Sequence, residues 1–426
     1  MRRTFRSLGT HNFRLWFFPG LVSNVGAWMQ ATAVSWVVLT ELTPGDAVAV
    51  GVTMALQLAP QIVLVPITGL IADRIDRRKL LIASSIALTL LTICIGLLLA
   101  SGLAELWHFL LFALVFGLIT AIDQPARNTI VSDLVPERDI PNAVALNLAN
   151  HHAARLVGPA TAGVIIATLG SGWVFVLNAV TFLPLIAGLA LMRKRELVPV
   201  VRAARQRGDA LAGFRYIGRR PDLGVLLGMI FLLGIIGMNF QLFAATMAVE
   251  FGAGPSEFGL LTSVMATGSL LGALLSAGRE RARLRVVLIA GAAMGTLCLL
   301  AAFMPTFWTF AFVTVFIGLA GVTTFTTANG YAQVATQPAL RGRVMSIHMA
   351  VLAAGTPVGA PLIGWITNEF GARWALGSAF LLSVAACVVG LGWYGLRRRR
   401  RDNEPPATRP GTTGVTEPLP RPEGTA

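Results

Sequence analysis

The stretch Gly69-Leu70-Ile71-Ala72-Asp73-Arg74-Ile75-Asp76-Arg77-Arg78 separates two long apolar runs, 48–70 and 80–101. Gly69 allows a neighbouring helix to approach closely, because glycine has no side chain. Asp73 offers a carboxylate to a facing helix N-terminus, where the helix dipole favours an anion. Arg74, Arg77 and Arg78 can pair with that carboxylate or anchor the chain at a membrane surface. We interpret these residues as a gating latch that forms in one conformation and breaks in another; the alternative is that the charges only fix topology.

Basic residues fall on alternate connections between the apolar runs. They occur in the connections 73–79, 193–220 and 279–285, whereas the intervening connections 40–47 and 102–105 contain none. Only Arg373, which follows an arginine-free connection, departs from the pattern. Membrane insertion retains basic connections in the cytoplasm, and a soluble protein has no reason to sort arginine in this way. The pattern predicts a multi-pass protein of the cell membrane with both termini in the cytoplasm.

The composition supports a lipid environment and argues against several other classes of protein. The chain is 55% hydrophobic and 13% charged, whereas soluble domains carry roughly 25% charged residues. The net charge of +14 comes from arginines scattered over short connections and a tail, not from a folded basic module, so we expect lipid and not nucleic acid as the partner. The sequence has no P-loop, no H-E-x-x-H and no nucleophile paired with a base, which argues against an enzyme. The three cysteines lie in apolar runs without metal-binding spacing, so we expect no metal.

The apolar runs predict twelve membrane-spanning helices, since one crossing needs about 20 apolar residues. The longest basic connection divides them into two six-helix halves, 1–192 and 223–396. We predict that 193–222 is a cytoplasmic linker and that the basic, proline-rich tail 397–426 is disordered. The halves also repeat: Val157-Gly158, Gly163 and Ile165 recur as Val358-Gly359, Gly364 and Ile366. This duplication is typical of secondary transporters.

The predicted fifth span combines a helix kink with a charge inside the membrane. Gly158, Pro159 and Gly163 predict a kink and close helix packing. Arg155 lies deep in the same span, and such a charge normally faces a cavity or a partner. Asp123 is the nearest acidic candidate. The two side chains form either a pair whose aspartate carries protons or a static charge pair between spans four and five.

These motifs resemble those of the major facilitator superfamily. The stretch 69–78 is similar to its G-x-x-x-D-R-x-x-R-R signature, and Gly158-Pro159-Ala160-Thr161-Ala162-Gly163 resembles the G-P-x-x-G-G element of drug and proton antiporters, with Ala162 in place of one glycine. Phe13-Arg14-Leu15-Trp16, Asp123-Gln124-Pro125-Ala126-Arg127 and Leu211-Ala212-Gly213-Phe214-Arg215-Tyr216 resemble the branch that contains macrolide efflux proteins and the enterobactin exporter.

The resemblance implies an all-helical major facilitator fold that works as a monomer. It implies efflux of an amphipathic small molecule, driven by the proton gradient without another cofactor. Spans one, four, seven and ten line the cavity in that fold, which points to Asn24, Gln30, Asn239 and Gln241 as substrate contacts. For each of them a packing hydrogen bond between helices is an equal alternative. Gly26-Ala27-Trp28 lacks the acidic residue of many relatives, so either Asp123 replaces it or the cargo is neutral or anionic.

We therefore expect a proton-coupled exporter of a siderophore, drug or similar compound that works by alternating access. Uptake of a nutrient by the same fold is the second possibility. A membrane sensor or scaffold that transports nothing is the third, although such a protein has no need for the motif at 69–78 or for Arg155.

Overall fold

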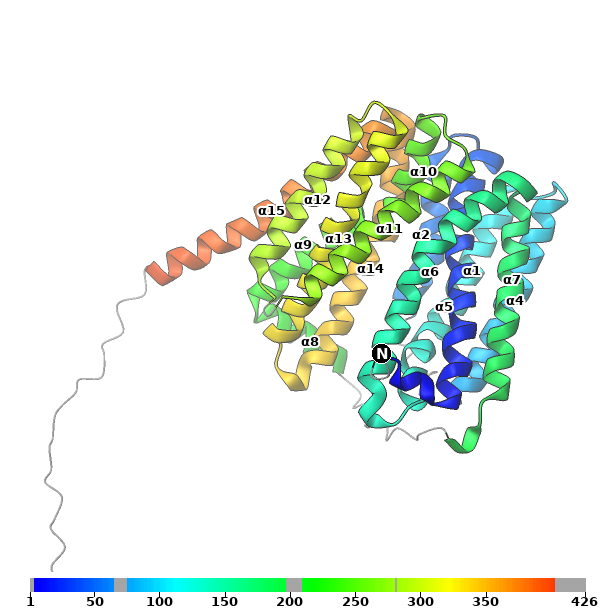
Figure 1. Cartoon of the computed structure of the whole chain (residues 1–426). Helices are drawn as coiled ribbons and strands as arrows, with labels where there is room; N and C mark the ends of the chain where they lie inside the picture. The colour runs from blue at the N-terminus through cyan, green and yellow to red at the C-terminus, as the bar shows by residue number, and fades with distance from the viewer. Residues whose placement is uncertain (1–3, 65–74, 197–208, 280–281, 403–426) are drawn as a thin grey trace, which may run out of the picture.

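In a computed structural model, the structure describes residues 4–64, 75–196, 209–279 and 282–402, and the regular secondary structure in these parts is helical. The helices form two bundles that lie side by side (Figure 1). Helices of the first bundle are α1 His11–Val37, α2 Ala47–Val63, α4 Arg77–Ala100, α5 Leu106–Asp133, α6 Ile140–Leu169 and α7 Ser171–Leu191. Those of the second are α9 Pro221–Gly237, α10 Phe240–Glu250, α11 Pro255–Ala277, α12 Leu284–Ala302, α13 Phe307–Ala335, α14 Arg341–Phe370 and α15 Ala372–Asp402.

Within the described residues, ten helical segments are long and apolar enough to cross a membrane, and α9 and α10 together form one of them. Twelve crossings are expected from the sequence. The difference lies in α1 and α2. The described part of α2 is apolar but has only 17 residues. In α1, polar residues such as Asn12, Asn24 and Gln30 lower the mean hydropathy of the helix.

Aspartate and glycine set several helix ends. The Asp46 carboxylate accepts hydrogen bonds from the first backbone N–H groups of α2, and Asp76 does the same for α4. At the other end, α6 and α14 both stop at a glycine with positive φ, Gly170 at 92° and Gly371 at 94°. A left-handed glycine ends a helix without steric cost. The two glycines occupy equivalent places in the sequence repeat, so helix termination is repeated as well.

Glycines also let the helices of the repeat pack in equivalent ways. A Cβ at Gly158 of α6 would lie 2.6 Å from Cβ of Trp28 in α1. A Cβ at Gly359, the repeated position in α14, would lie 2.7 Å from Cγ2 of Ile235 in α9. Each half therefore packs its fifth predicted span against its own first one through the same glycine.

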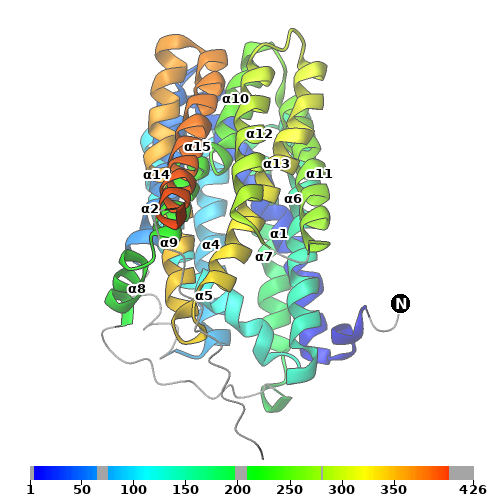
Figure 2. The ribbon, with the colours of Figure 1, turned by 90° about the vertical axis from the view of Figure 1, so that its left-hand side faces the viewer.

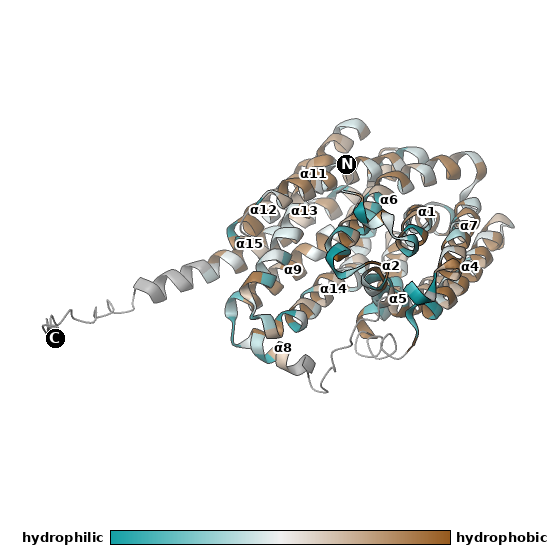
Figure 3. Cartoon of the chain, turned by 60° about the horizontal axis from the view of Figure 1, so that its bottom comes forward, coloured by the Kyte–Doolittle hydropathy of each residue, from teal (hydrophilic) through white to brown (hydrophobic). Residues whose placement is uncertain are grey.

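The two bundles touch through α2 with α14 and through α6 with α11. The contacts lie towards one end of the molecule, and the bundles diverge towards the other end (Figure 1). The start of α1 and α8 both lie towards that diverging end (Figures 1 and 2). Seen from that end, hydrophilic residues gather at helix tips while the helix bodies are mostly hydrophobic (Figure 3).

The predicted linker and tail contain more helix than expected. The amphipathic part of the linker forms α8, Asp209–Gly218. The predicted disordered tail begins at residue 397, yet α15 continues as a helix to Asp402. The correction has a simple cause, because arginine is a good helix former and extends a helix that is already nucleated. The rest of the tail, 403–426, lies outside the described residues.

Candidate functional site

A cavity of about 310 Å³ lies between the two bundles. Both bundles line it, because α1 and α6 contribute from one side and α9 to α13 from the other. The cavity is lined by Trp28, His151, Arg155, Pro159, Ile236, Gly237, Met238, Phe240, Gln241, Thr262, Met265, Ser269, Met294, Ile317, Gly318, Gly321, Val322 and Phe325. A space shared by two bundles changes shape whenever the bundles move relative to each other.

Arg155 is the one arginine or lysine among the described lining residues, and it lies over an aromatic ring. Its Cζ atom lies 5.3 Å from the centroid of the Trp28 ring, within the range of a cation–π interaction. The His151 ring packs against the same indole at 5.6 Å between centroids. His151, Arg155 and Pro159 are spaced by four residues along α6 and therefore share a helix face. Gly158 allows α1 to come close enough for Trp28 to reach this face.

A break between α9 and α10 brings backbone to the wall of the cavity opposite α6. The helix α9 ends at Gly237 and α10 begins at Phe240. Between them Asn239 donates from Nδ2 to the carbonyl oxygens of Ile235, at 2.8 Å, and of Gly355 in α14, at 3.2 Å. The break is thereby anchored to α14. A Cβ at Gly237 would lie 2.4 Å from the Phe325 ring, so a larger residue there would displace that ring.

The lining is amphipathic and contains no aspartate or glutamate among the described residues. Met238, Met265 and Met294 present flexible thioethers, which adapt to ligands of different shape. Gln241, Thr262 and Ser269 add polar groups. A pocket of this kind suits a ligand with a large apolar part and a few polar or charged groups.

Only one of the four predicted substrate contacts lines this cavity. Gln241 does, and its Nε2 reaches the Thr32 hydroxyl of the other bundle at 3.5 Å. Gln30 is buried and accepts a hydrogen bond from Asn178 at 2.7 Å. Asn24 donates to Asn150 at 3.0 Å, and Asn239 bonds to backbone as described above. These three side chains form hydrogen bonds that hold packed helices together, which is the alternative to a substrate contact.

The expected pair between Asp123 and Arg155 is wrong for this conformation. Asp123 is 2% exposed, forms an ion pair with Arg127 of its own helix, and accepts a hydrogen bond from Ser84 of α4. Arg155 forms no ion pair within the described residues. Asp123 and Arg127 are four residues apart, so helix geometry brings them together without help from another span.

In the described part of the motif at 69–78, Arg77 and Arg78 form hydrogen bonds with other helices of the first bundle. Arg77 donates to both carboxylate oxygens of Asp133 in α5, at 2.9 and 2.7 Å. Arg78 donates to the carbonyls of Leu189 and Ala190 at the end of α7, where the helix dipole favours a cation. Gly69, Asp73 and Arg74 lie outside the described residues, so the latch stays a prediction.

Where the bundles meet, backbone packs on backbone. A Cβ at Gly163 of α6 would lie 2.4 Å from the Pro255 carbonyl oxygen of α11. The repeated position in α14, Gly364, would meet the Ala47 carbonyl oxygen of α2 at the same distance, 2.4 Å. Beside it, Asn368 donates to Asp46 at 2.8 Å and accepts from the Ala47 N–H at 2.9 Å. We call these contacts the closed end; they hold α6 to α11 and α2 to α14.

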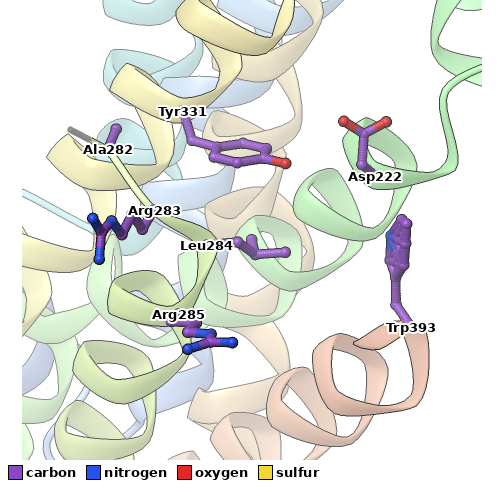
Figure 4. Close-up of a pocket in the computed structure, with 7 residues that line it drawn as sticks. All are labelled: Asp222, Ala282, Arg283, Leu284, Arg285, Tyr331 and Trp393. Atoms are coloured by element: carbon purple, nitrogen blue, oxygen red, sulfur yellow. The ribbon is translucent and has the colours of Figure 1, made fainter. Parts of the chain in front are cut away.

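A second pocket, of about 350 Å³, belongs to the second bundle alone. Figure 4 shows Leu284 and Tyr331 directed towards the side where Asp222 and Trp393 lie. The Asp222 carboxylate is already held by Arg220, at 2.9 and 2.8 Å. No residue of the first bundle lines this pocket among those described.

Comparison with known proteins identifies the family. Residues 3–411 match the family model described as transmembrane secretion effector. The chain belongs to that family of major facilitator superfamily transporters. Its family consists of membrane transporters and not of enzymes, and the chain is a multi-pass membrane protein. The prediction of the superfamily, and of its branch with the enterobactin exporter and macrolide efflux proteins, is confirmed.

Three curated relatives illustrate the branch. The uncharacterized MFS-type transporter YfiS of Bacillus subtilis is 28% identical over 61% of this chain, which spans only 62% of that relative. The enterobactin exporter EntS of Shigella flexneri is 26% identical over 84% of this chain and 85% of its own length. Macrolide efflux protein A of Streptococcus pyogenes is 24% identical over 82% of this chain and 88% of its own length.

Solved structures share the fold. The inward-facing, unoccupied bacterial homologue of the human lysosomal transporter Spinster superposes with a TM-score of 0.67 at 17% identity, over 93% of this chain and 99% of that one. The nucleoside transporter NupG superposes with a TM-score of 0.72 at 13% identity, over 90% of this chain and all of that one (100%). At these identities the likeness concerns the fold alone.

Proposed function

We propose that this protein is a proton-coupled exporter of a siderophore, drug or similar amphipathic small molecule. The observation that carries the proposal is the cavity between the bundles, whose wall joins Arg155 and Trp28 of one bundle to methionines and Gln241 of the other. The similarity to an enterobactin exporter and to a macrolide efflux protein supports export over uptake.

Alternating access accounts for the closed end and the diverging end. In our proposal the chain has twelve crossings in two halves, 1–192 and 223–396, with both termini in the cytoplasm as the arginine pattern indicates. The conformation described here then faces the cytoplasm, where an exporter collects its cargo. Rocking of one half against the other breaks the closed end and releases the cargo outside.

The proton gradient supplies the energy in this proposal, without a further cofactor, and the working unit is a monomer. Asp123 is our candidate proton carrier because it is buried among polar partners in the first bundle. Protonation of its carboxylate weakens the ion pair with Arg127, which would couple a proton to the packing of α4 against α5.

Transport by purified protein in liposomes tests the proposal. The experiment follows lipophilic drugs and siderophores under an imposed pH gradient, in vesicles whose protein orientation has been established by protease accessibility. We expect gradient-dependent movement out of the cytoplasmic side that collapses with a protonophore. Gradient-dependent movement in the opposite direction would favour an importer, and no movement of any compound by folded protein would favour a sensor or scaffold.

A further inference from the structure

We infer that the cargo is an amphipathic anion, and that Arg155 recognises its anionic group against the Trp28 ring. The inference rests on the proposed function and adds the charge class of the cargo to it. It starts from the contrast between Arg155, which lies inside a predicted membrane span, and the arginines of the described chain that are paired with a carboxylate. Arginines with an aspartate or glutamate within ion-pair distance are Arg6, Arg77, Arg127, Arg138, Arg193, Arg220 and Arg373.

Arg155 is half-buried inside a predicted membrane span and has no such carboxylate within the described residues. A guanidinium in this position is costly, and it is normally compensated by a partner or by a water-filled cavity. Its neighbour here is the face of Trp28, and the His151 ring packs against the same indole. The indole offsets part of the cost of desolvation, but it does not neutralise the charge.

The cation–π contact with Trp28 also leaves Arg155 able to bind. A guanidinium that lies over an aromatic face keeps its N–H donors in its own plane, where they match the two oxygens of a carboxylate or a phosphate. The lining of the cavity places Arg155 among polar donors, since His151 and Gln241 border the same space. An anionic group of the cargo would supply the negative charge that the described cavity wall lacks.

The rest of the wall selects the shape of the cargo. Phe240 and Phe325 add aromatic surface opposite α6, and three methionines add polarisable surface. No lining carboxylate is present among the described residues to attract a cation, and Arg155 would repel one. The cavity therefore favours an anion with a large aromatic or aliphatic body over a lipophilic cation of the same size.

Two xanthene dyes provide a matched pair of probes, because 5-carboxyfluorescein is anionic and rhodamine 123 is cationic on a similar framework. Their binding to the purified full-length protein is measured by fluorescence polarisation. We expect wild-type protein to bind the anionic dye at least about tenfold more tightly, as expected for a charge-assisted hydrogen bond in a half-buried site. Arg155→Gln should abolish that preference.

Two further variants keep the test specific. Arg155→Lys retains the charge without the planar fork and should keep part of the anion preference. Arg14→Gln removes an exposed charge from α1 and should bind both dyes like the wild type. Equal binding of the two dyes by wild-type protein, no binding of either, or unchanged anion binding by folded Arg155→Gln would overturn the inference.

Transport separates this inference from the proposed function. If the anionic dye binds through Arg155 but does not move across liposomes under a pH gradient, the inference stands as recognition and the export proposal fails. If a gradient drives rhodamine 123 while the anionic dye does not bind, export stands and the charge class is wrong.

Discussion

Gly163 and Gly259 bring the backbones of α6 and α11 into direct contact at the closed end. A Cβ on Gly163 would lie 3.2 Å from Cα of Gly259, and a Cβ on Gly259 would lie 2.3 Å from the Pro159 carbonyl oxygen. Backbone cannot move aside as a flexible side chain can. The closed end therefore depends on the absence of two side chains, and this dependence can be tested with a single methyl group.

Gly259→Ala should lower transport about tenfold, because overpacking at such a contact costs roughly 1–3 kcal/mol and disfavours the closed end. The measurement is gradient-driven dye movement in liposomes at matched protein density. Gly228→Ala in α9 is the control, since a Cβ there meets nothing within 4 Å. Equal transport by the two variants would contradict the role given to this contact.

Asn368 joins the bundles at the other contact of the closed end through two hydrogen bonds, to Asp46 and to the Ala47 N–H. Asn368→Ala removes both. Each contributes about 1 kcal/mol, so the ratio of closed to open molecules should fall about tenfold or more. Spin labels at Leu103 and Phe303, exposed positions in different bundles, would report a larger population of long distances.

Thr367→Val is the matched control for Asn368, because within the described parts of the chain the Thr367 hydroxyl bonds only to the Ile363 carbonyl of its own helix. Its distance distribution should equal that of the wild type. An unchanged distribution in Asn368→Ala as well would show that the glycine contacts alone hold the closed end.

Asp123→Asn should make transport independent of the pH gradient while leaving cargo binding intact, if this carboxylate carries the proton. Asp133→Asn is a demanding control, since it also breaks an ion pair on α5, the one with Arg77. Transport is compared with and without a gradient for both variants. The assignment fails if Asp123→Asn keeps the gradient dependence, or if both variants lose it equally.

Arg78→Lys should lower the thermal unfolding temperature by about 1–3 °C, because lysine keeps the charge but loses the fork that binds two carbonyls of α7. Topology should not change, since the charge is retained. Arg14→Lys, an exchange at an exposed position, should have no effect on stability. If Arg78→Lys also unfolds like the wild type, Arg78 acts only as a topological charge.

Periodic and compositional features of the chain were enough to predict a helical membrane transporter. Apolar runs and the sorting of arginine are properties of whole segments, so local packing does not change them. The repeat around Gly163 and Gly364 could also be read from the sequence, and both glycines serve the closed end. What could not be read was which surface each glycine meets, because that depends on the relative position of two distant helices.

The site was harder to predict because the depth of a residue in a membrane span does not show which neighbour its side chain faces. Asn24, Gln30 and Asn239 lie at suitable depths but face neighbouring helices. For Asp123 the spacing to Arg127 already offered a partner four residues away, which was a better guide than depth. Trp28 could not be predicted as a site residue, because an aromatic residue in an apolar span carries no functional signal until Arg155 is placed beside it.

The break between α9 and α10 was also missed. Gly237-Met238-Asn239 contains no proline, and Asn239 interrupts the helix through bonds to Ile235 and to Gly355 of another helix. Such a break arises from tertiary contacts and leaves only a weak local signature.

Two accessible thioethers in the cavity wall make its chemistry sensitive to oxidants. Conversion of Met238 or Met265 to the sulfoxide replaces a flexible apolar surface with a polar, chiral one. Oxidation of these methionines does not change the charge of Arg155. Oxidative damage would therefore leave charge recognition in place while reducing affinity for the apolar body of the cargo. Cells under oxidative stress would then hold a transporter that still selects the right charge but retains its cargo less well, and methionine sulfoxide reduction would restore it.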